Sequence, residues 1–185
     1  VMVVEIMGHK AGWLALYAGA AAGADVILIP EVPYDIKKVG KAIQKKIEAG
    51  QNYAVIACAE GAMDTEEGKL DKKAFKKARA KLTESIAYRV ARELEAETGK
   101  ETRTSVLGYT QRGADPKPYD IVLASQFGQA AVEMAVQKKF GNLVAVIDGK
   151  ISATPLSEVA GKIKPIPLDN PLLLAERDLG VCFGD

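Results

Sequence analysis

The sequence predicts an α/β domain of three layers, in which helices cover both faces of a mainly parallel sheet. Short runs of apolar and β-branched residues alternate along the chain with longer segments of helical periodicity. Nearly every position in the early runs is apolar, as in strands that are buried on both faces. The 185 residues are 48% hydrophobic, which is enough for one well-filled core, and no repeat or linker divides them. We therefore expect a single domain over residues 1–185.

Four pairs of a strand and a helix are expected in order along the chain. They are 1–6 with 11–23, 26–30 with 34–49, 53–59 with 72–98, and 104–107 with 119–139. The helix over 72–98 is expected because apolar residues recur on one of its faces. That apolar stripe consists of Phe75, Leu82, Ile86, Val90 and Leu94. The runs 144–147 and 151–155, separated by Asp148-Gly149-Lys150, predict a β-hairpin, and short helical segments follow it.

Charge and composition indicate which binding partners and which cellular compartment to expect. The net charge of +1 gives no overall attraction to nucleic acid or to an anionic membrane, and no apolar run is long enough to span a bilayer. The lysines of segment 69–81 are accompanied by Glu66, Glu67 and Asp71 and lack an aromatic stripe, so we expect a solvated helix face there. Cys58 and Cys182 have no metal-ligand spacing and are expected to be reduced thiols in the cytoplasm.

Ligands of an open parallel sheet bind beyond the carboxyl ends of its strands. Four segments of this chain are expected at such positions, namely 7–9, 30–35, 59–61 and 108–113. In the first of them, Gly8 and the nearby Gly12 have two interpretations. They either allow close packing of the backbone or present N–H groups to an anion at the start of a helix.

Three side chains in these segments carry the chemistry of a candidate site. Glu60 either faces water or accepts hydrogen bonds from sugar hydroxyls. Arg112 is either a surface ion-pair partner or a bidentate ligand of a phosphate. His9 is the only histidine, and no serine or cysteine nucleophile with an orienting carboxylate forms a triad with it. The residues by themselves therefore support a site for a phosphorylated metabolite at the strand ends, and no more than that.

Two long segments resemble the 6-phosphofructokinases, which are ATP- or pyrophosphate-dependent. Residues 4–35, VEIMGHKAGWLALYAGAAAGADVILIPEVPYD, resemble the family's V-E-V-M-G-R turn, small-residue helix and G-A-D-x-x-L-I-P-E segment. Residues 101–133, ETRTSVLGYTQRGADPKPYDIVLASQFGQAAVE, are similar to its L-G-x-x-Q-R-G-G-x-P-x-x-x-D segment. The order and spacing agree over much of the chain. The resemblance implies a Rossmann-like three-layer domain that forms the C-terminal half of the phosphofructokinase fold.

The family transfers a phosphoryl group from ATP or pyrophosphate to the 1-hydroxyl of fructose 6-phosphate in glycolysis, with Mg²⁺. The resemblance therefore implies that this chain binds the sugar phosphate. The implied binding residues are Met7, Gly8, His9, Glu60, Arg103, Tyr109 and Arg112. Among them, Glu60 is implied to hold the sugar hydroxyls, and Tyr109 stands where many relatives have histidine. Arg103 matches an arginine that reaches the 6-phosphate of a neighbouring subunit, which implies a homodimer or a homotetramer.

Two departures from the family pattern bear on the expected activity. His9 stands where the family usually has an arginine that helps to stabilise the transferring phosphoryl group, so its catalytic role is open. The Gly-Gly-Asp donor loop and the aspartate base of the family's N-terminal half are not found in residues 1–185. We therefore expect that this chain lacks the domain that binds the donor and most of the Mg²⁺, and that it is inactive alone. A non-catalytic subunit that binds a sugar phosphate, or regulates in response to it, is the alternative hypothesis.

Overall fold

The computed structural model describes residues 1–80 and 83–185, without the side chain of Lys72. Contacts within the chain group into two compact units. The first, which we call the sheet unit, consists of Val1–Gln111 and Lys164–Asp185, and the second, the hairpin unit, consists of Arg112–Ile163. The assignment of residues 1–185 to one sugar-phosphate-binding domain is not decided by this grouping and stays a prediction.

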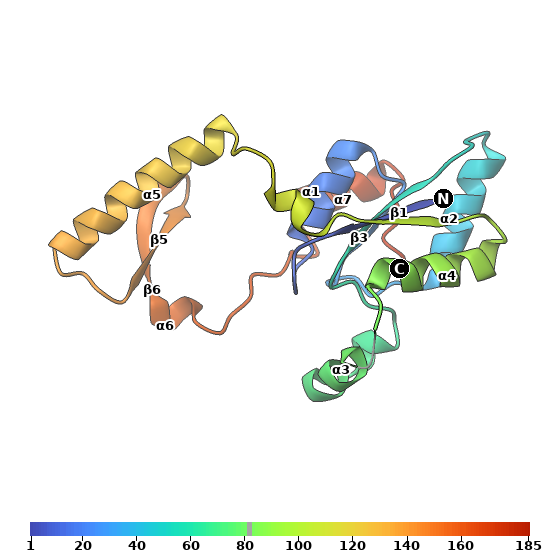
Figure 1. The fold of residues 1–185 in the computed structure, drawn as a ribbon, viewed down its shortest axis with the longest axis horizontal. Coiled ribbons are helices and arrows are strands. Elements are labelled where there is room, and N and C mark those ends of the chain that lie inside the picture. The colour runs from blue at the N-terminus through green and yellow to red at the C-terminus, as the bar shows by residue number, and fades with distance from the viewer. Residues whose placement is uncertain (81–82) are drawn as a thin grey trace. The chain divides into compact units, whose positions relative to one another are not determined.

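The sheet unit contains a four-stranded sheet in the order β2-β3-β1-β4, in which every neighbouring pair is parallel (Figure 1). Its strands are β1 Met2–Ile6, β2 Val26–Leu28, β3 Val55–Ala59 and β4 Arg103–Val106. Met2 lies opposite both Val55 and Arg103, so β1, β3 and β4 begin at the same edge of the sheet. The parallel sheet predicted from the apolar runs is confirmed.

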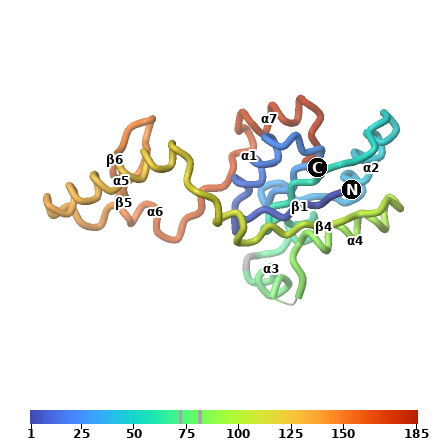
Figure 2. Tube along the Cα trace, turned by 45° about the horizontal axis from the view of Figure 1, so that its top comes forward, coloured from blue at the N-terminus to red at the C-terminus, as the bar shows by residue number. Residues whose placement is uncertain are grey.

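Helices lie on both faces of this sheet, as the alternation of strands and helices predicts (Figure 2). They are α1 Trp13–Ala22, α2 Ile36–Glu48, α3 Lys72–Arg79, α4 Ile86–Thr98 and α7 Pro171–Asp178, with the short 3₁₀ helices η1 Glu67–Lys69 and η2 Gly108–Arg112. Helix α1 packs on one face against β2 and β3, whereas α2 and α4 contact each other on the opposite face. Within the described residues, no helix is long and apolar enough to cross a membrane.

The core of the sheet unit lies between the sheet and these helices. Its strand residues Val3, Ile27, Leu28 and Ile56 are completely buried. Leu16 of α1 covers one face, and a group of completely buried side chains from α2 and α4 covers the other. That group consists of Val39, Ile43, Val90 and Leu94. Both faces of the sheet are therefore apolar, which explains why the strand sequences are apolar at nearly every position.

The single helix predicted over 72–98 is wrong, because two helices, α3 and α4, occupy this segment. The carboxylate of Asp71 caps α3 by accepting hydrogen bonds from the N–H groups of Lys73 and Ala74. Ser85 has an extended backbone, so α4 begins anew after it. The apolar periodicity continues across the break, and periodicity alone did not reveal the interruption. Lys81 and Leu82, which the predicted helix included, lie outside the described residues.

The hairpin unit consists of α5 Pro118–Val136, the antiparallel strands β5 Asn142–Ile147 and β6 Lys150–Pro155, and the short helix α6 Leu156–Val159. The predicted hairpin is confirmed, with a tighter turn than expected, since Ile147 lies opposite Lys150. Asp148 and Gly149 occupy the turn with φ values of 50° and 75°, the left-handed conformation that two-residue hairpin turns favour. No residue of Arg112–Ile163 is buried, so this unit has secondary structure without a core.

Candidate functional site

The turn between β1 and α1 forms the base of the candidate site. A backbone hydrogen bond closes the turn, in which the N–H of Ala11 donates to the carbonyl oxygen of Gly8 at 3.2 Å. A Cβ on Gly8 would lie 2.6 Å from the carbonyl oxygen of Ala11, which is too close for any side chain. Glycine is therefore required at this position. His9 has φ 54°, in the left-handed region, and its side chain is exposed. The turn therefore presents His9 and Lys10 outward at the carboxyl edge of the sheet.

Glu60 is held against this turn from the end of β3. Its N–H donates to the carbonyl oxygen of Ile6 at 2.9 Å, which extends the pairing of β3 with β1 by one residue. One carboxylate oxygen of Glu60, Oε1, accepts hydrogen bonds from the N–H groups of Gly8 at 3.2 Å and of His9 at 2.5 Å. Glu60 therefore does not simply face water, because its carboxylate is fixed by the backbone of the turn.

Gly61 allows the two strand ends to come together at this place. A Cβ on Gly61 would lie 2.2 Å from the carbonyl oxygen of His9, closer than any side chain can approach a backbone atom. The absence of a side chain at this position thus brings the β1–α1 turn and the end of β3 into contact.

A second carboxylate that sequence reasoning missed lies at the start of α1. The side-chain oxygens of Glu31 both accept from the N–H of Gly12 at 3.1 Å, and Oε1 also accepts from the N–H of Ile166 at 2.9 Å. A Cβ on Gly12 would lie 2.4 Å from Cγ2 of Ile29, which favours the close-packing interpretation of this glycine. The N–H of Gly12 is thus bound to a carboxylate. The position of Glu31 directly after a predicted strand was the available signal.

The segment after β4 contacts the same turn through Gln111. Its side-chain oxygen Oε1 accepts from the N–H of Met7 at 3.2 Å, and its Nε2 donates to the carbonyl oxygen of Gly108 at 3.1 Å. Gln111 therefore connects η2 to the base of the site, a role that the sequence did not predict. Tyr109 lies in η2 with 82% of its surface exposed. Arg112 is the last residue of η2 and the first of the hairpin unit, and its side chain is also exposed.

Arg103 lies away from the other predicted site residues of the sheet unit. It pairs with Met2 at the amino edge of the sheet, whereas Glu60 follows the carboxyl end of β3. Its Nη2 forms an exposed ion pair with Glu101 at 2.7 Å. Because opposite edges of the sheet separate them, Arg103 and Glu60 of one chain do not form one site.

A cavity of about 220 Å³ opens beside Glu60. Its lining comes from the β1–α1 turn, the segments after β2 and β3, and helix α3. The lining residues are His9, Lys10, Pro30, Glu60, Gly61, Met63, Phe75 and Arg79. Phe75 and Arg79 were not predicted as site residues, because α3 was interpreted only as a solvated helix face. The lysine-rich sequence around them gave no signal for their position in the tertiary structure.

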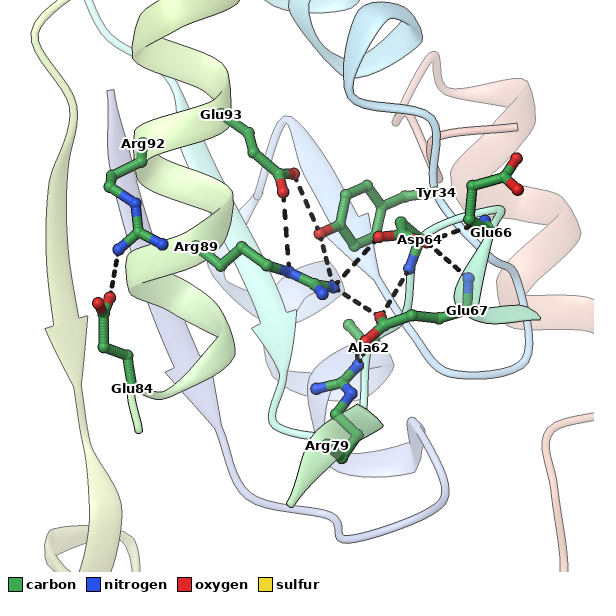
Figure 3. A network of polar contacts seen from close by, with 10 residues as sticks. All are labelled: Tyr34, Ala62, Asp64, Glu66, Glu67, Arg79, Glu84, Arg89, Arg92 and Glu93. Atoms are coloured by element: carbon green, nitrogen blue, oxygen red, sulfur yellow. Dashed lines mark hydrogen bonds and ion pairs between the residues drawn. The ribbon is translucent and has the colours of Figure 1, made fainter. Parts of the chain in front are cut away.

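Arg79, which lines this cavity, belongs to a network of charged residues (Figure 3). Oε2 of Glu67 accepts from Nη2 of Arg89 at 2.7 Å and from Nη2 of Arg79 at 3.1 Å. The phenolic oxygen of Tyr34 accepts from Nη2 of Arg89 at 3.2 Å. Burial alone would raise the pKa of Glu67, but the hydrogen bond from Arg89 and the charge of Arg79 hold that pKa below its usual range. Glu67 is therefore the ionised centre of the network.

The described residues offer no protein site for a resident metal ion. No group of three or more histidine, cysteine, aspartate or glutamate side chains among them is arranged to hold one. Both cysteines are free, and burial raises the pKa of the Cys58 thiol to about 12, so Cys58 is not a nucleophile. What the site offers is a fixed carboxylate, backbone N–H groups and cationic side chains around a small cavity. This set suits a ligand that carries both hydroxyl and anionic groups.

Comparison with known proteins identifies a family model and curated relatives. The family model described as Phosphofructokinase matches residues 1–135. The ATP-dependent 6-phosphofructokinase of Spirochaeta thermophila is 48% identical over 186 residues, a match that covers 100% of this chain and 51% of that protein. The ATP-dependent 6-phosphofructokinase 3 of Bacteroides thetaiotaomicron is 44% identical and is covered to 50%. The chain thus spans about half the length of the curated relatives it matches.

The fold is also that of a solved structure. The pyrophosphate-dependent phosphofructokinase of Marinobacter aquaeolei superposes with a TM-score of 0.73 at 24% identity. The superposition covers 100% of this chain and 48% of that one. At this level of identity the likeness is one of fold, and it confirms the α/β architecture predicted from the sequence.

Proposed function

Because this chain belongs to the phosphofructokinase family, we propose that it forms the half of a 6-phosphofructokinase that binds fructose 6-phosphate. The observation that carries the proposal is the position of Glu60. Its carboxylate is fixed by two N–H groups of the β1–α1 turn and borders a cavity with Lys10 and Arg79. A fixed acceptor among cations is suited to a phosphorylated sugar, whose hydroxyls donate and whose phosphate requires positive charge.

Each proposed binding residue has a role that follows from its position. The backbone at Met7, Gly8 and His9 lines the sugar, and Glu60 accepts hydrogen bonds from its hydroxyls. Tyr109 and Arg112 bind the 6-phosphate through a phenolic hydroxyl and a guanidinium, both of which donate to phosphate oxygens.

Arg103 is proposed to bind the 6-phosphate in a second copy of the chain. It lies at the amino edge of the sheet, so it does not reach the site of its own chain. A homodimer, or a homotetramer built from such dimers, would place this exposed arginine against a neighbour's site. The supporting observation is that, among the described residues, its guanidinium forms an ion pair only with the equally exposed Glu101.

The proposed reaction forms a bond between the 1-hydroxyl oxygen of the sugar and the terminal phosphorus of ATP. The bond from that phosphorus to the bridging oxygen breaks, and ADP leaves with the electron pair. The hydroxyl proton passes to a base that lies outside this chain. The relatives from Spirochaeta and Bacteroides are ATP-dependent by name, which supports ATP over pyrophosphate as the donor. The products are fructose 1,6-bisphosphate and ADP, as in glycolysis, which takes place in the cytoplasm.

Magnesium is implied by the family, but the described residues do not form a ligand set for it. We therefore assign the ion, with the donor, to the half of the enzyme that this chain does not contain, and derive no step through it. The residues of this chain bind and orient the sugar. They act in the reaction by holding the 1-hydroxyl in place for attack.

A non-catalytic subunit that binds or senses the sugar phosphate is the second proposal. One observation favours it, namely that His9 occupies the position where the family usually has arginine. Neutral imidazole has one N–H donor, whereas a guanidinium offers a charged pair of donors to the phosphoryl group. In an enzyme weakened at this position, His9→Arg should raise the turnover number. A large fall in turnover would contradict that expectation.

The proposal is tested by steady-state kinetics of the full-length protein that contains this chain. Arg112→Ala should raise the KM for fructose 6-phosphate roughly ten- to a hundredfold, because a charge-assisted contact of about 1.5–3 kcal/mol is lost. Glu60→Gln should raise it as well. The double substitution Lys76→Ala, Lys77→Ala is the matched control, and it should leave KM unchanged. Equal effects of Arg112→Ala and of the control would contradict the site. A wild-type protein that binds the sugar without phosphorylating it would favour the non-catalytic subunit.

A further inference from the structure

Helix α3 brings a guanidinium to the cavity beside Glu60. Asp71 caps the start of this helix, and Arg79 is its last residue. The exposed fraction of the Arg79 side chain is 19%, and it lines the cavity together with His9, Lys10 and Glu60. No role has followed for Arg79 from the motifs of the sequence.

The guanidinium of Arg79 is held in place on several sides (Figure 3). Its Nη2 donates to Oε2 of Glu67 at 3.1 Å and to the carbonyl oxygen of Ala62. The ring of Phe75 lies 5.2 Å from its central carbon, within the range of a cation–π contact. The loop after β3 and the preceding turn of α3 therefore orient this side chain before any ligand binds.

The charge balance around Arg79 is shared with Arg89. Glu67 accepts from both guanidiniums, and Arg89 has two further carboxylates near it, Asp64 at 3.7 Å and Glu93 at 3.8 Å. Arg79 has Glu67 as its only carboxylate partner among the described residues. The Nε atoms of both arginines are buried there without a hydrogen-bond partner. Of the two arginines, Arg79 is thus the one whose charge fewer carboxylates balance, and it is the one that lines the cavity.

From these observations, and resting on the proposed function, we propose that Arg79 binds the phosphoryl group at carbon 1 of the sugar. Tyr109, the residue of the sheet unit that is proposed to bind the 6-phosphate within its own chain, is absent from the lining of this cavity. The cations that do line it, Lys10 and Arg79, therefore face the other end of a sugar that is held at Glu60. Arg79 would stabilise the negative charge on the phosphoryl oxygens during transfer, which His9 does less well than an arginine.

The proposal separates kcat from KM in the full-length enzyme. Arg79→Ala should lower kcat about a hundredfold, as expected when a fixed donor to the transferring group is removed. The KM for fructose 6-phosphate should change less than about threefold, because this substrate has no phosphoryl group at carbon 1. The inhibition constant of fructose 1,6-bisphosphate, which has one, should rise about tenfold or more.

Control variants distinguish ligand binding from a structural role of Arg79. Arg92→Ala removes an exposed arginine of α4 that pairs with Glu84, and all three constants should stay unchanged. Phe75→Leu keeps the charge of Arg79 but removes the ring beneath it. If Arg79 only anchors α3, Phe75→Leu should lower kcat as much as Arg79→Ala, and the inference is overturned.

Two further measurements extend the test, of which the first does not need Arg79→Ala and the second applies when that variant folds. Arg79→Lys keeps the positive charge, and it should bind fructose 1,6-bisphosphate more tightly than Arg79→Gln while both bind fructose 6-phosphate equally. Guanidinium ion at low millimolar concentration should raise the kcat of a folded Arg79→Ala enzyme, an effect that a missing structural anchor would not show. Equal product binding by the lysine and glutamine variants would overturn the inference.

The inference and the proposed function fail in different ways. If wild-type enzyme phosphorylates fructose 6-phosphate and Arg79→Ala keeps its kcat, only the role of Arg79 is wrong. If Arg79→Ala raises the KM for fructose 6-phosphate with kcat unchanged, Arg79 binds the substrate elsewhere, and the assignment to carbon 1 is wrong. If the wild-type protein has no phosphofructokinase activity, the proposed function fails, and the inference fails with it.

Discussion

The two units of this chain differ in what surrounds their apolar side chains. Helix α4 of the sheet unit has 13 residues, and five of them are buried. Helix α5 of the hairpin unit has 19 residues, and none of them is buried. Leu16 is 0% exposed in the first unit, whereas Val136 is 77% exposed in the second. The local sequence is sufficient to form both helices. Their side chains differ in burial because only α4 has another layer of the structure to pack against.

This difference shows that secondary structure and a core are separate requirements. The hairpin unit has a long helix, a well-paired hairpin and a favourable turn. Its apolar side chains nevertheless line an open hollow of about 540 Å³, with Phe127, Met134 and Phe140 on its walls. A helix and a two-stranded hairpin without a single buried side chain have little to offset their loss of conformational entropy. The sheet unit is therefore expected to carry most of the stability of the 185-residue chain.

The largest expected effect is on hydrogen exchange. Backbone amides of α4 should be protected by the global stability of the sheet unit, while those of α5 should open locally at almost no cost. A gap of about 4 kcal/mol between them corresponds to exchange about a thousandfold faster in α5. Exchange measured residue by residue by NMR at pH 7 checks this. Equal protection of the two helices would mean that the hairpin unit is covered in solution, for instance by a second copy.

The next largest difference is expected in the free energy of unfolding, when the same side chain is truncated in each of the two units. Leu16→Ala removes a completely buried side chain and should lower the free energy of unfolding by about 2–5 kcal/mol. Leu156→Ala removes the same atoms from a side chain that is 45% exposed in the hairpin unit, and it should cost about 0.5 kcal/mol or less. Urea denaturation of both variants provides the measurement. If Leu156→Ala proves as destabilising as Leu16→Ala, the hairpin unit does not lack a core as described.

The loss of folding stability at acid pH should also originate in the sheet unit. Burial alone would raise the pKa of Asp25, but its contacts with Lys46 at 2.8 Å and with the N–H of Val55 at 2.8 Å hold that pKa below its usual range. A carboxyl group with a lowered folded-state pKa stabilises the protein above its unfolded pKa of about 3.9, and this contribution disappears as pH falls through the folded-state pKa. Asp25→Asn should therefore lower the free energy of unfolding by about 1–3 kcal/mol at pH 7 and by less at pH 3, which lies below the unfolded pKa.

Unfolding of the Asp25 variant at pH 7, 5 and 3 tests this sign. The control is Asp115→Asn, at an exposed position of the hairpin unit, and it should shift stability by about 0.5 kcal/mol or less at every pH. A constant penalty for Asp25→Asn across the series would show that its charge is not what stabilises the fold.

The smallest expected effect on folding comes from the exposed face of α5. Val132→Lys and Val136→Lys replace side chains that are 64% and 77% exposed, so the free energy of unfolding should change by about 0.5 kcal/mol or less. Their effect should appear instead in association, because an exposed apolar face promotes self-association of the isolated chain. Sedimentation at increasing concentration should show a smaller apparent mass for the double variant. An unchanged mass distribution would contradict a role of this face in association.

The sequence predicted the sheet well because its evidence is local. A parallel strand that is buried on both faces is apolar at nearly every position, and such runs were visible at β1, β2 and β3. The hairpin was predicted for the same reason, since Asp148-Gly149 occupies a recognisable turn. The break between α3 and α4 was missed because α4 begins anew after the extended backbone of Ser85, while the apolar period runs through the break.

The site was predictable where a residue lies directly at a strand end. His9 and Glu60 were placed there by the order of strands alone, and the structure brings them together. Glu31, Gln111 and Arg79 were missed as site residues because their contacts join distant segments, and no local pattern encodes those pairings. The resemblance suggested that Arg103 acts across an interface, and the parallel register supplies a physical reason, since it places Arg103 and Glu60 at opposite edges of the sheet.

That separation has a genetic consequence. Suppose that a second copy supplies Arg103. Glu60→Gln then damages the site of its own subunit, whereas Arg103→Ala damages the site of the neighbouring subunit. In a mixed dimer of the two, one site carries both defects and the other receives an intact Glu60 and an intact Arg103. Random exchange of equal amounts makes half of the dimers mixed, so about a quarter of the wild-type activity should return. Two alleles that fail separately would then complement each other in one cell.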